Sequence, residues 1–110
     1  MMPAKASMVS PAQAPLTLRS VVLRSVETNW ISPTQLRVDL RFRSDGKRLR
    51  YAPVIVFGGQ IQDPRREARA IAKFLRSHVY AAAGWDMCIQ DQRRVAEAVL
   101  TALKKITSTR

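Results

Sequence analysis

The clearest pattern in the chain is an alternation of apolar and polar residues on both sides of an Asp-Gly pair. In the segment TQLRVDLRFRS, residues 34–44, the apolar positions are Leu36, Val38, Leu40 and Phe42. A period of two is typical of a strand that buries one face. Asp45-Gly46 favours a two-residue type I′ turn, because both central positions of that turn need positive φ. The segment therefore predicts a β-hairpin.

The two-residue turn also predicts which residues of the two strands face each other. The expected pairs are Ser44 with Lys47, Arg43 with Arg48, Phe42 with Leu49, Arg41 with Arg50, and Leu40 with Tyr51. This register brings the apolar faces of both strands together. The opposite face collects five arginines: Arg37, Arg41, Arg43, Arg48 and Arg50. Turn chemistry and alternation lead independently to the same register, which makes the hairpin the firmest structural prediction.

The flanking segments extend this sheet. The β-branched residues of LTLRSVVLRSV, residues 16–26, predict a first strand. The following ETNWISP is expected to turn the chain, with Asn29 and Pro33 as strand breakers and Trp30 covering one end of the core. Pro53 cannot donate a ladder hydrogen bond, so the third strand is expected at a sheet edge or with a local bulge.

Two helices are predicted after the sheet. Asp63 is a good N-cap and Pro64 a good first-turn residue, so the first helix is expected to run to about Ala82, with Gly84 near its C-cap. Its expected buried stripe is Ala68, Ile71, Ala72, Leu75 and Val79, flanked by Phe74 and His78. GWDMCIQ is interpreted as a link to a second helix, roughly residues 91–107.

The predicted fold class is α+β, with a three-stranded antiparallel β-meander packed on two C-terminal helices in the order β-β-β-α-α. Residues 1–15 are rich in Pro, Ala and Ser and are expected to form a disordered tail before a single domain over residues 16–110. One face of such a sheet stays solvated, and here that face carries the arginines.

Composition adds a class of partner to this picture. The chain has 19 basic and 8 acidic residues, a formal net charge of +11, which is typical of proteins that meet nucleic acid, an acidic protein or anionic lipid. The basic helices lack the bulky apolar residues that membrane-surface binding needs, so no membrane partner is expected. A single Cys and a single His fit a cytoplasmic, reducing interior. The acid-free N-terminus leaves an organelle transit peptide as an alternative.

The arginine face is the main candidate site. Arg43 opposite Arg48 and Arg41 opposite Arg50 are like-charged pairs, and cross-strand pairs of this kind change stability by roughly 0.2–1 kcal/mol. Asp39 is the only acid expected on this face, so an external anion would compensate the repulsion. Two alternatives remain: the face is simply solvated, or its charges deter pairing between sheet edges.

The first helix offers a second basic set. Arg65 and Arg66 lie in its first turn, where an anion also meets free backbone N–H groups. A basic stripe follows at Arg65, Arg69, Lys73 and Arg76. By itself this pattern is more typical of a solvated helix face, and it gains weight only together with the hairpin.

RREARAIAKFL, residues 65–75, after a three-stranded sheet resembles the last helix of double-stranded-RNA-binding domains. That resemblance implies phosphate contacts by Arg65, Arg66 and Arg69. It covers eleven residues, while the first helix of the family is missing and an extra helix follows. The layout is also similar to DNA-binding modules that read the major groove with a three-stranded sheet.

The remaining side chains disfavour catalysis. The acids have turn, cap or surface explanations, His78 is interpreted as a histidine at the core edge, and Cys88 has no partner motif. No enzyme activity, metal or cofactor is expected. Phe42, Tyr51, Phe57 and Phe74 are expected in the core, leaving Trp30, Trp85 and Tyr80 as the exposed candidates outside the basic sheet pattern. Duplex or backbone binding is therefore favoured over base stacking on a single strand.

Two function classes follow. The first is a small nucleic-acid-binding module that contacts the phosphate backbone through Arg37, Arg41, Arg43, Arg48, Arg50, Arg65, Arg66, Arg69 and Lys73. The second is a protein-interaction module or inhibitor, of the kind that phages and plasmids encode, docking on an acidic surface of a nucleic-acid-processing complex. A homodimer through a free edge strand or the second helix is compatible with either.

Overall fold

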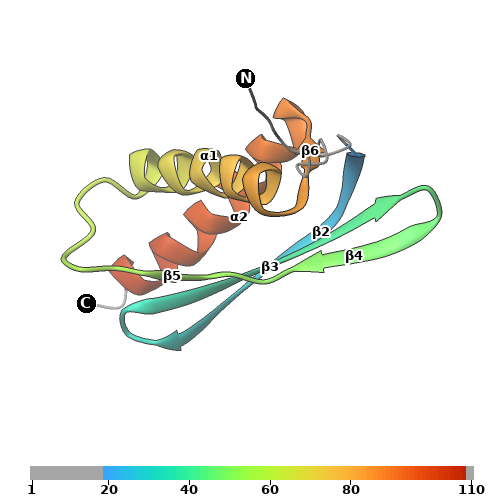
Figure 1. Ribbon diagram of the computed structural model, residues 1–110. Helices are drawn as coiled ribbons and strands as arrows, with labels where there is room; N and C mark the ends of the chain where they lie inside the picture. Colours follow the sequence, from blue (N-terminus) through green and yellow to red (C-terminus); the bar gives the residue numbers. More distant parts are fainter. Residues whose placement is uncertain (1–18, 109–110) are drawn as a thin grey trace, which may run out of the picture.

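In the computed structural model, a β-sheet forms one layer and two helices cover one of its faces (Figure 1). The description covers residues 19–108, and the tail predicted over residues 1–15 lies outside it. The strands are β2 (Arg19–Ser32), β3 (Gln35–Ser44), β4 (Lys47–Tyr51), β5 (Val54–Val56) and β6 (Trp85–Met87). The helices are α1 (Pro64–Ala83) and α2 (Ile89–Ser108), and neither is long and apolar enough to cross a membrane.

The sheet is mixed and has five strands in the described part of the chain. Its order is β4-β3-β2-β6, and β5 pairs with β3 beyond the end of β4. The α+β class and the two C-terminal helices agree with the prediction, but the purely antiparallel three-stranded sheet was wrong. Trp85–Met87, interpreted from sequence as part of a link, pairs in parallel with Arg19–Val21. This parallel pairing is possible because α1 supplies the crossover connection that returns the chain to the start of β2.

The first turn lies later than the sequence suggested. β2 continues through Asn29 and Trp30, which pair with Arg37 and Leu36, and the chain turns only after Ser32. The Trp30 indole N–H donates to the Ala102 carbonyl at 3.1 Å, and its ring packs against the core. Packing and pairing thus outweigh the weak strand propensity of Asn29.

The hairpin register is confirmed at all five predicted pairs, from Ser44 with Lys47 to Leu40 with Tyr51. Asp45 and Gly46 have φ of 51° and 76°, the positive values that the Asp-Gly turn requires. Pro53 lies at the sheet edge, as expected, and separates β4 from β5. Its carbonyl accepts the Val38 N–H at 2.9 Å, so β3 stays hydrogen-bonded across the break.

The core lies between the sheet and the helices. The four alternating residues of β3 are fully buried, and the predicted stripe of α1 is buried along its length. Phe74 was wrongly placed in this core, because its side chain is 56% exposed. It lies on the flank of α1 that faces β5, and this edge strand is only three residues long, too short to cover the ring.

Helix ends are held by polar contacts. The Asp63 carboxylate accepts the Arg66 N–H at the start of α1, and left-handed Gly84 ends the helix by donating its N–H to the Tyr80 carbonyl. The start of α2 is attached to β2, since buried Asp91 accepts the Leu23 N–H at 3.0 Å. Arg94 pairs with Asp91 and donates to the Leu23 carbonyl, which fixes β2 at the register shift after Leu23.

Candidate nucleic-acid interface

The outward face of the sheet carries the predicted arginines, arranged in rows across the strands. In the row nearest the hairpin turn, Arg43 is flanked by Arg48 and by exposed Val22. In the next row, Arg41 is flanked by Arg50 and by Ser25. Like charges therefore stand directly opposite each other at both positions, as the register predicted.

The second of these like-charged pairs is compensated inside the molecule. The Arg50 guanidinium donates from Nε to Asp39 Oδ1 at 3.0 Å and from Nη2 to Asp39 Oδ2 at 2.8 Å. Arg41 Nη2 lies 3.5 Å from the same Oδ2 atom. The hydrogen bonds from Arg50 lower the pKa of the nearly buried Asp39 carboxyl, against the opposing effect of its burial, and the charges of both arginines add to this shift. Asp39 thus holds the Arg50 guanidinium by two hydrogen bonds and forms a looser ion pair with Arg41.

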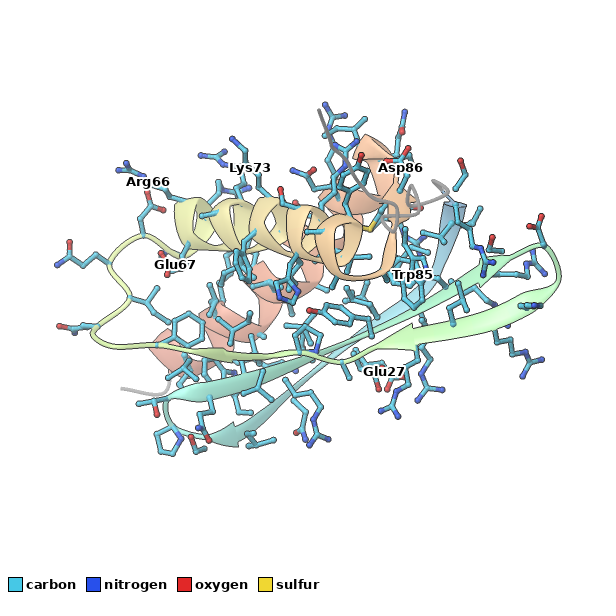
Figure 2. The ribbon with its side chains drawn as sticks, viewed as in Figure 1. Glu27, Arg66, Glu67, Lys73, Trp85 and Asp86 are labelled. Atoms are coloured by element: carbon cyan, nitrogen blue, oxygen red, sulfur yellow. The ribbon has the colours of Figure 1, made fainter. Side chains whose placement is uncertain are left out.

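Asp39 is also not the only acid on this face, contrary to the expectation. Glu27 pairs with Asp39 in the register of β2 and β3, and Figure 2 shows it on the side of the sheet away from the helices. Glu27 was not expected on this face because the segment 27–33 was interpreted from its sequence as a turn. Its carboxylate helps to raise the pKa of Arg50, after the larger contribution of Asp39.

The acids divide the arginine face into two parts. We call Arg41, Arg43, Arg48 and Arg50 the hairpin cluster. Within residues 19–108, Arg43 and Arg48 have no ion-pair partner. The turn end of the hairpin extends past the helix layer (Figure 1), so this end of the cluster is open to a large ligand. Arg37 lies beyond Asp39, between Asn29 and Val54, and is separated from the cluster.

The basic residues of α1 lie on a different surface. Arg65 and Arg69 line a groove of about 220 Å³ between the helices, together with Arg93 of α2. Lys73 and Arg76 line a cavity of about 480 Å³ further along the same two helices. We call the surface formed by these five residues, Arg65, Arg69, Lys73, Arg76 and Arg93, the helix groove. Arg93 was missed as a member because sequence periodicity does not show which faces of two helices adjoin.

The structure does not bring the helix residues together with the sheet arginines. The helices cover the core face of the sheet, whereas the hairpin cluster lies on its outward face. Figure 2 shows Arg66 and Lys73 on the side of α1 away from the sheet, opposite Glu27. Arg66 lines a third cavity, beside the loop before α1. The predicted site residues therefore form two separate basic surfaces, with Arg37 and Arg66 outside both.

Among the described residues, no three His, Cys, Asp or Glu side chains gather in a way that could hold a metal ion. His78 stacks on Tyr51 and Phe74, and its Nδ1 atom forms a hydrogen bond with the Tyr51 hydroxyl. Burial raises the pKa of the Tyr51 hydroxyl further above its ordinary value, at which the group is already neutral at physiological pH. The contact joins α1 to the edge strand, a structural explanation for both side chains.

Comparison with known proteins assigns no family: no family model matches the chain, and no curated protein or solved structure is similar to it. The resemblance of residues 65–75 to the last helix of double-stranded-RNA-binding domains therefore rests on those residues and on the layout alone. The chemistry of the two basic surfaces has to carry any functional conclusion.

Proposed function

We propose that this protein is a small nucleic-acid-binding module that contacts the phosphate backbone of a duplex through the hairpin cluster. The observation that carries the proposal is the direct opposition of Arg43 and Arg48, with no acid paired to either within residues 19–108. Opposed like charges destabilise a sheet, and a phosphate between them would turn this repulsion into two charge-assisted hydrogen-bond contacts.

The pair formed with Asp39 supports the same proposal. Arg50 uses Nε and Nη2 for the carboxylate, which leaves Nη1 free to donate to a ligand. A guanidinium that is already held in place loses less rotational freedom when it binds phosphate. The cluster thus combines open charges with partly fixed ones.

The test is binding of a fluorescently labelled DNA or RNA duplex, followed by anisotropy over a range of salt concentrations. For the wild type, we expect the logarithm of affinity to fall linearly with the logarithm of salt. The double reversal Arg43→Glu and Arg48→Glu removes the phosphate held between them, so the slope should become shallower by about 0.9, the value for one phosphate. Binding at low salt should also weaken more than tenfold.

The matched control is Arg65→Glu with Arg69→Glu, which changes the net charge equally on the opposite side of the molecule. This variant should bind the duplex much better than the hairpin variant. Equal losses in the two variants would mean that total charge, and not the hairpin cluster, determines binding. A wild-type protein that binds neither duplex at low salt would refute the proposal.

A second function is favoured by one specific observation, the apolar edge at β5. Val54, Val56 and Phe74 are 40%, 66% and 56% exposed and line a shallow cavity of about 380 Å³. An acidic protein could add a strand to this edge, with Arg37 nearby as a charge partner. Such a complex would survive nuclease treatment and would be lost on Val56→Lys, because an edge lysine opposes strand addition.

A further inference from the structure

The cavity lined by Lys73 and Arg76 combines cations with an exposed aromatic ring, which the hairpin cluster lacks. It lies where the end of α1 meets β6 and the start of α2, and its volume is about 480 Å³. Its lining residues are Lys73, Arg76, Ser77, Tyr80, Asp86, Ile89 and Gln92. Two of them are large apolar or aromatic side chains left open to solvent: Tyr80 is 47% exposed and Ile89 is 43% exposed. Cations and an exposed ring therefore share one hollow.

The fold holds the Arg76 side chain and the backbone at Tyr80. Tyr80 belongs to the last turn of α1, which is closed by the N–H of Gly84 donating to the Tyr80 carbonyl at 2.9 Å. Arg76 Nη1 donates to Gln92 Oε1 at 3.2 Å, so its guanidinium bridges from α1 to α2. The Arg76 guanidinium and the backbone that carries Tyr80 are consequently positioned before any ligand arrives, which lowers the entropy cost of binding.

The cations continue from this cavity along the helices. Arg65, Arg69, Lys73 and Arg76 follow one flank of α1 at spacings of four, four and three residues. Arg93 joins them from α2, where Glu97 is the acidic side chain among the three arginines that line the same hollow. A strip of positive charge that ends at an exposed aromatic ring is the arrangement by which proteins hold single-stranded nucleic acid, since cations follow the backbone while bases stack on rings.

We propose that the helix groove binds a single-stranded nucleic-acid segment, with one base stacked on Tyr80 and phosphates on the basic residues of the groove. This site is separate from the hairpin cluster and does not depend on the function proposed for it. The absence of aromatic residues from the basic sheet pattern argued for duplex binding there. The same reasoning, applied to the helices, favours a single strand.

Asp86 predicts which bases the site next to Tyr80 prefers. It is the acid among the described residues that line this cavity, and its carboxylate would repel a phosphate placed next to it. A carboxylate can only accept hydrogen bonds at neutral pH, so it pairs with a base that carries an exocyclic amino group. Adenine, cytosine and guanine carry such a group, whereas thymine does not. An adenine tract should therefore bind better than a thymine tract.

The first experiment measures binding of a short labelled oligodeoxyadenylate by fluorescence anisotropy. Tyr80→Ala should weaken binding about 5-fold to 150-fold, the range expected for loss of one stacked base. Tyr80→Phe keeps the ring and should retain wild-type affinity. Phe74→Ala removes another exposed ring of α1, one that faces β5, and should leave binding unchanged. If Tyr80→Ala binds as well as the wild type, the proposal is wrong.

The second experiment tests charge, base and source of ligand. Arg69→Glu with Arg93→Glu should weaken oligonucleotide binding more than tenfold, whereas Arg43→Glu with Arg48→Glu should affect it much less. Asp86→Asn should remove the preference for the adenine tract over the thymine tract. Adenosine monophosphate should compete only at far higher concentration than the oligonucleotide, because it lacks the contacts along the groove. Effective competition by the mononucleotide, or loss of binding in the hairpin variant alone, would overturn the assignment of the groove to a strand.

The two proposals can fail separately. A protein that binds duplex but no oligodeoxyadenylate at low salt would refute the groove assignment and leave the hairpin assignment standing. A protein that binds the oligonucleotide through Tyr80 but no duplex would do the reverse.

Discussion

At the scale of single residues, Asp39 compensates part of the positive charge on the arginine face. Its carboxylate lies almost buried between two guanidinium groups and accepts two hydrogen bonds from Arg50. Without it, Arg41 and Arg50 would repel each other across β3 and β4 as Arg43 and Arg48 do. Asp39 is therefore a structural residue as much as a member of a binding surface, and its protonation should affect stability.

The first prediction concerns pH. The pKa of Asp39 is lowered in the folded protein, so the folded state binds fewer protons here than the unfolded state, whose carboxyl titrates near pH 3.9. Its stabilising contribution is fully present above about pH 5 and is lost as the pH falls through the lowered value. The free energy of unfolding should therefore differ between wild type and Asp39→Asn at neutral pH, and this difference should shrink in acid.

Urea unfolding of the two proteins between about pH 2.5 and 7 measures that difference. Asp63→Asn is a useful control, because an asparagine N-cap can still accept the Arg66 N–H and the substitution does not touch the arginine pair. A difference between wild type and Asp39→Asn that stays constant down to the lowest pH would show that the ion pair does not contribute to stability.

At the scale of elements, the hairpin could be predicted because two independent signals agreed. Alternation from Leu36 to Phe42 defined the buried face, and Asp45-Gly46 defined the turn, so the register could only be one of a few. The helix signals were equally local: Asp63, Pro64 and Gly84 marked the ends of α1 within a residue or two. Local chemistry of this kind can be interpreted without knowing the rest of the fold.

What could not be predicted depends on contacts between distant parts of the chain. β6 is three residues long and becomes a strand only because α1 brings it beside the start of β2. Glu27 reaches the arginine face because Trp30 is held by Ala102, seventy-two positions away, which keeps β2 extended. Arg93 joins Arg65 only through the packing of two helices. All four residues of the hairpin cluster and four of the five residues of the helix groove were thus visible in the sequence, whereas the boundaries of the two surfaces were not.

The second prediction concerns the Asp45-Gly46 turn, which fixes the register that brings the arginines of the hairpin cluster together. Gly46 has φ of 76°, and a Cβ atom added there would meet nothing within 4 Å. Gly46→Ala should still destabilise the protein by about 1–2 kcal/mol, because the left-handed backbone itself is unfavourable for alanine. Gly58→Ala is the control, since Gly58 is equally open but outside that region of positive φ, and it should be neutral or slightly stabilising. Thermal unfolding of both variants checks this, and equal effects would contradict a cost from φ.

At the scale of the whole molecule, the two basic surfaces face away from each other. The sheet lies between the hairpin cluster and the core, and the helices lie between the core and the helix groove (Figure 1). A stacked sheet and helix layer measure roughly 10 Å between their centres, to which the side chains on both outer faces add. A single B-DNA duplex contacting the hairpin cluster therefore has no direct route to the groove. One protein molecule has room for two ligands at once.

The last prediction follows from this separation. If the duplex binds the hairpin cluster and the single strand binds the helix groove, a large excess of unlabelled oligodeoxyadenylate should leave most of a labelled duplex bound. Some loss of bound duplex is expected because the added oligonucleotide brings negative charge near a basic protein. This loss should diminish as salt rises, since screening shortens the range of such effects to about 8 Å at physiological ionic strength.

A capture experiment tests the same separation directly: an immobilised duplex should bind the labelled oligonucleotide only when the protein is present. Tyr80→Ala should weaken this capture by the same factor as it weakens oligonucleotide binding in solution, while the duplex still retains the protein. Arg43→Glu with Arg48→Glu should reduce capture by releasing the protein from the duplex. Simple competition, with the oligonucleotide displacing the duplex in proportion to its concentration, would instead require that both ligands share one surface, which is incompatible with two faces on opposite sides of the sheet.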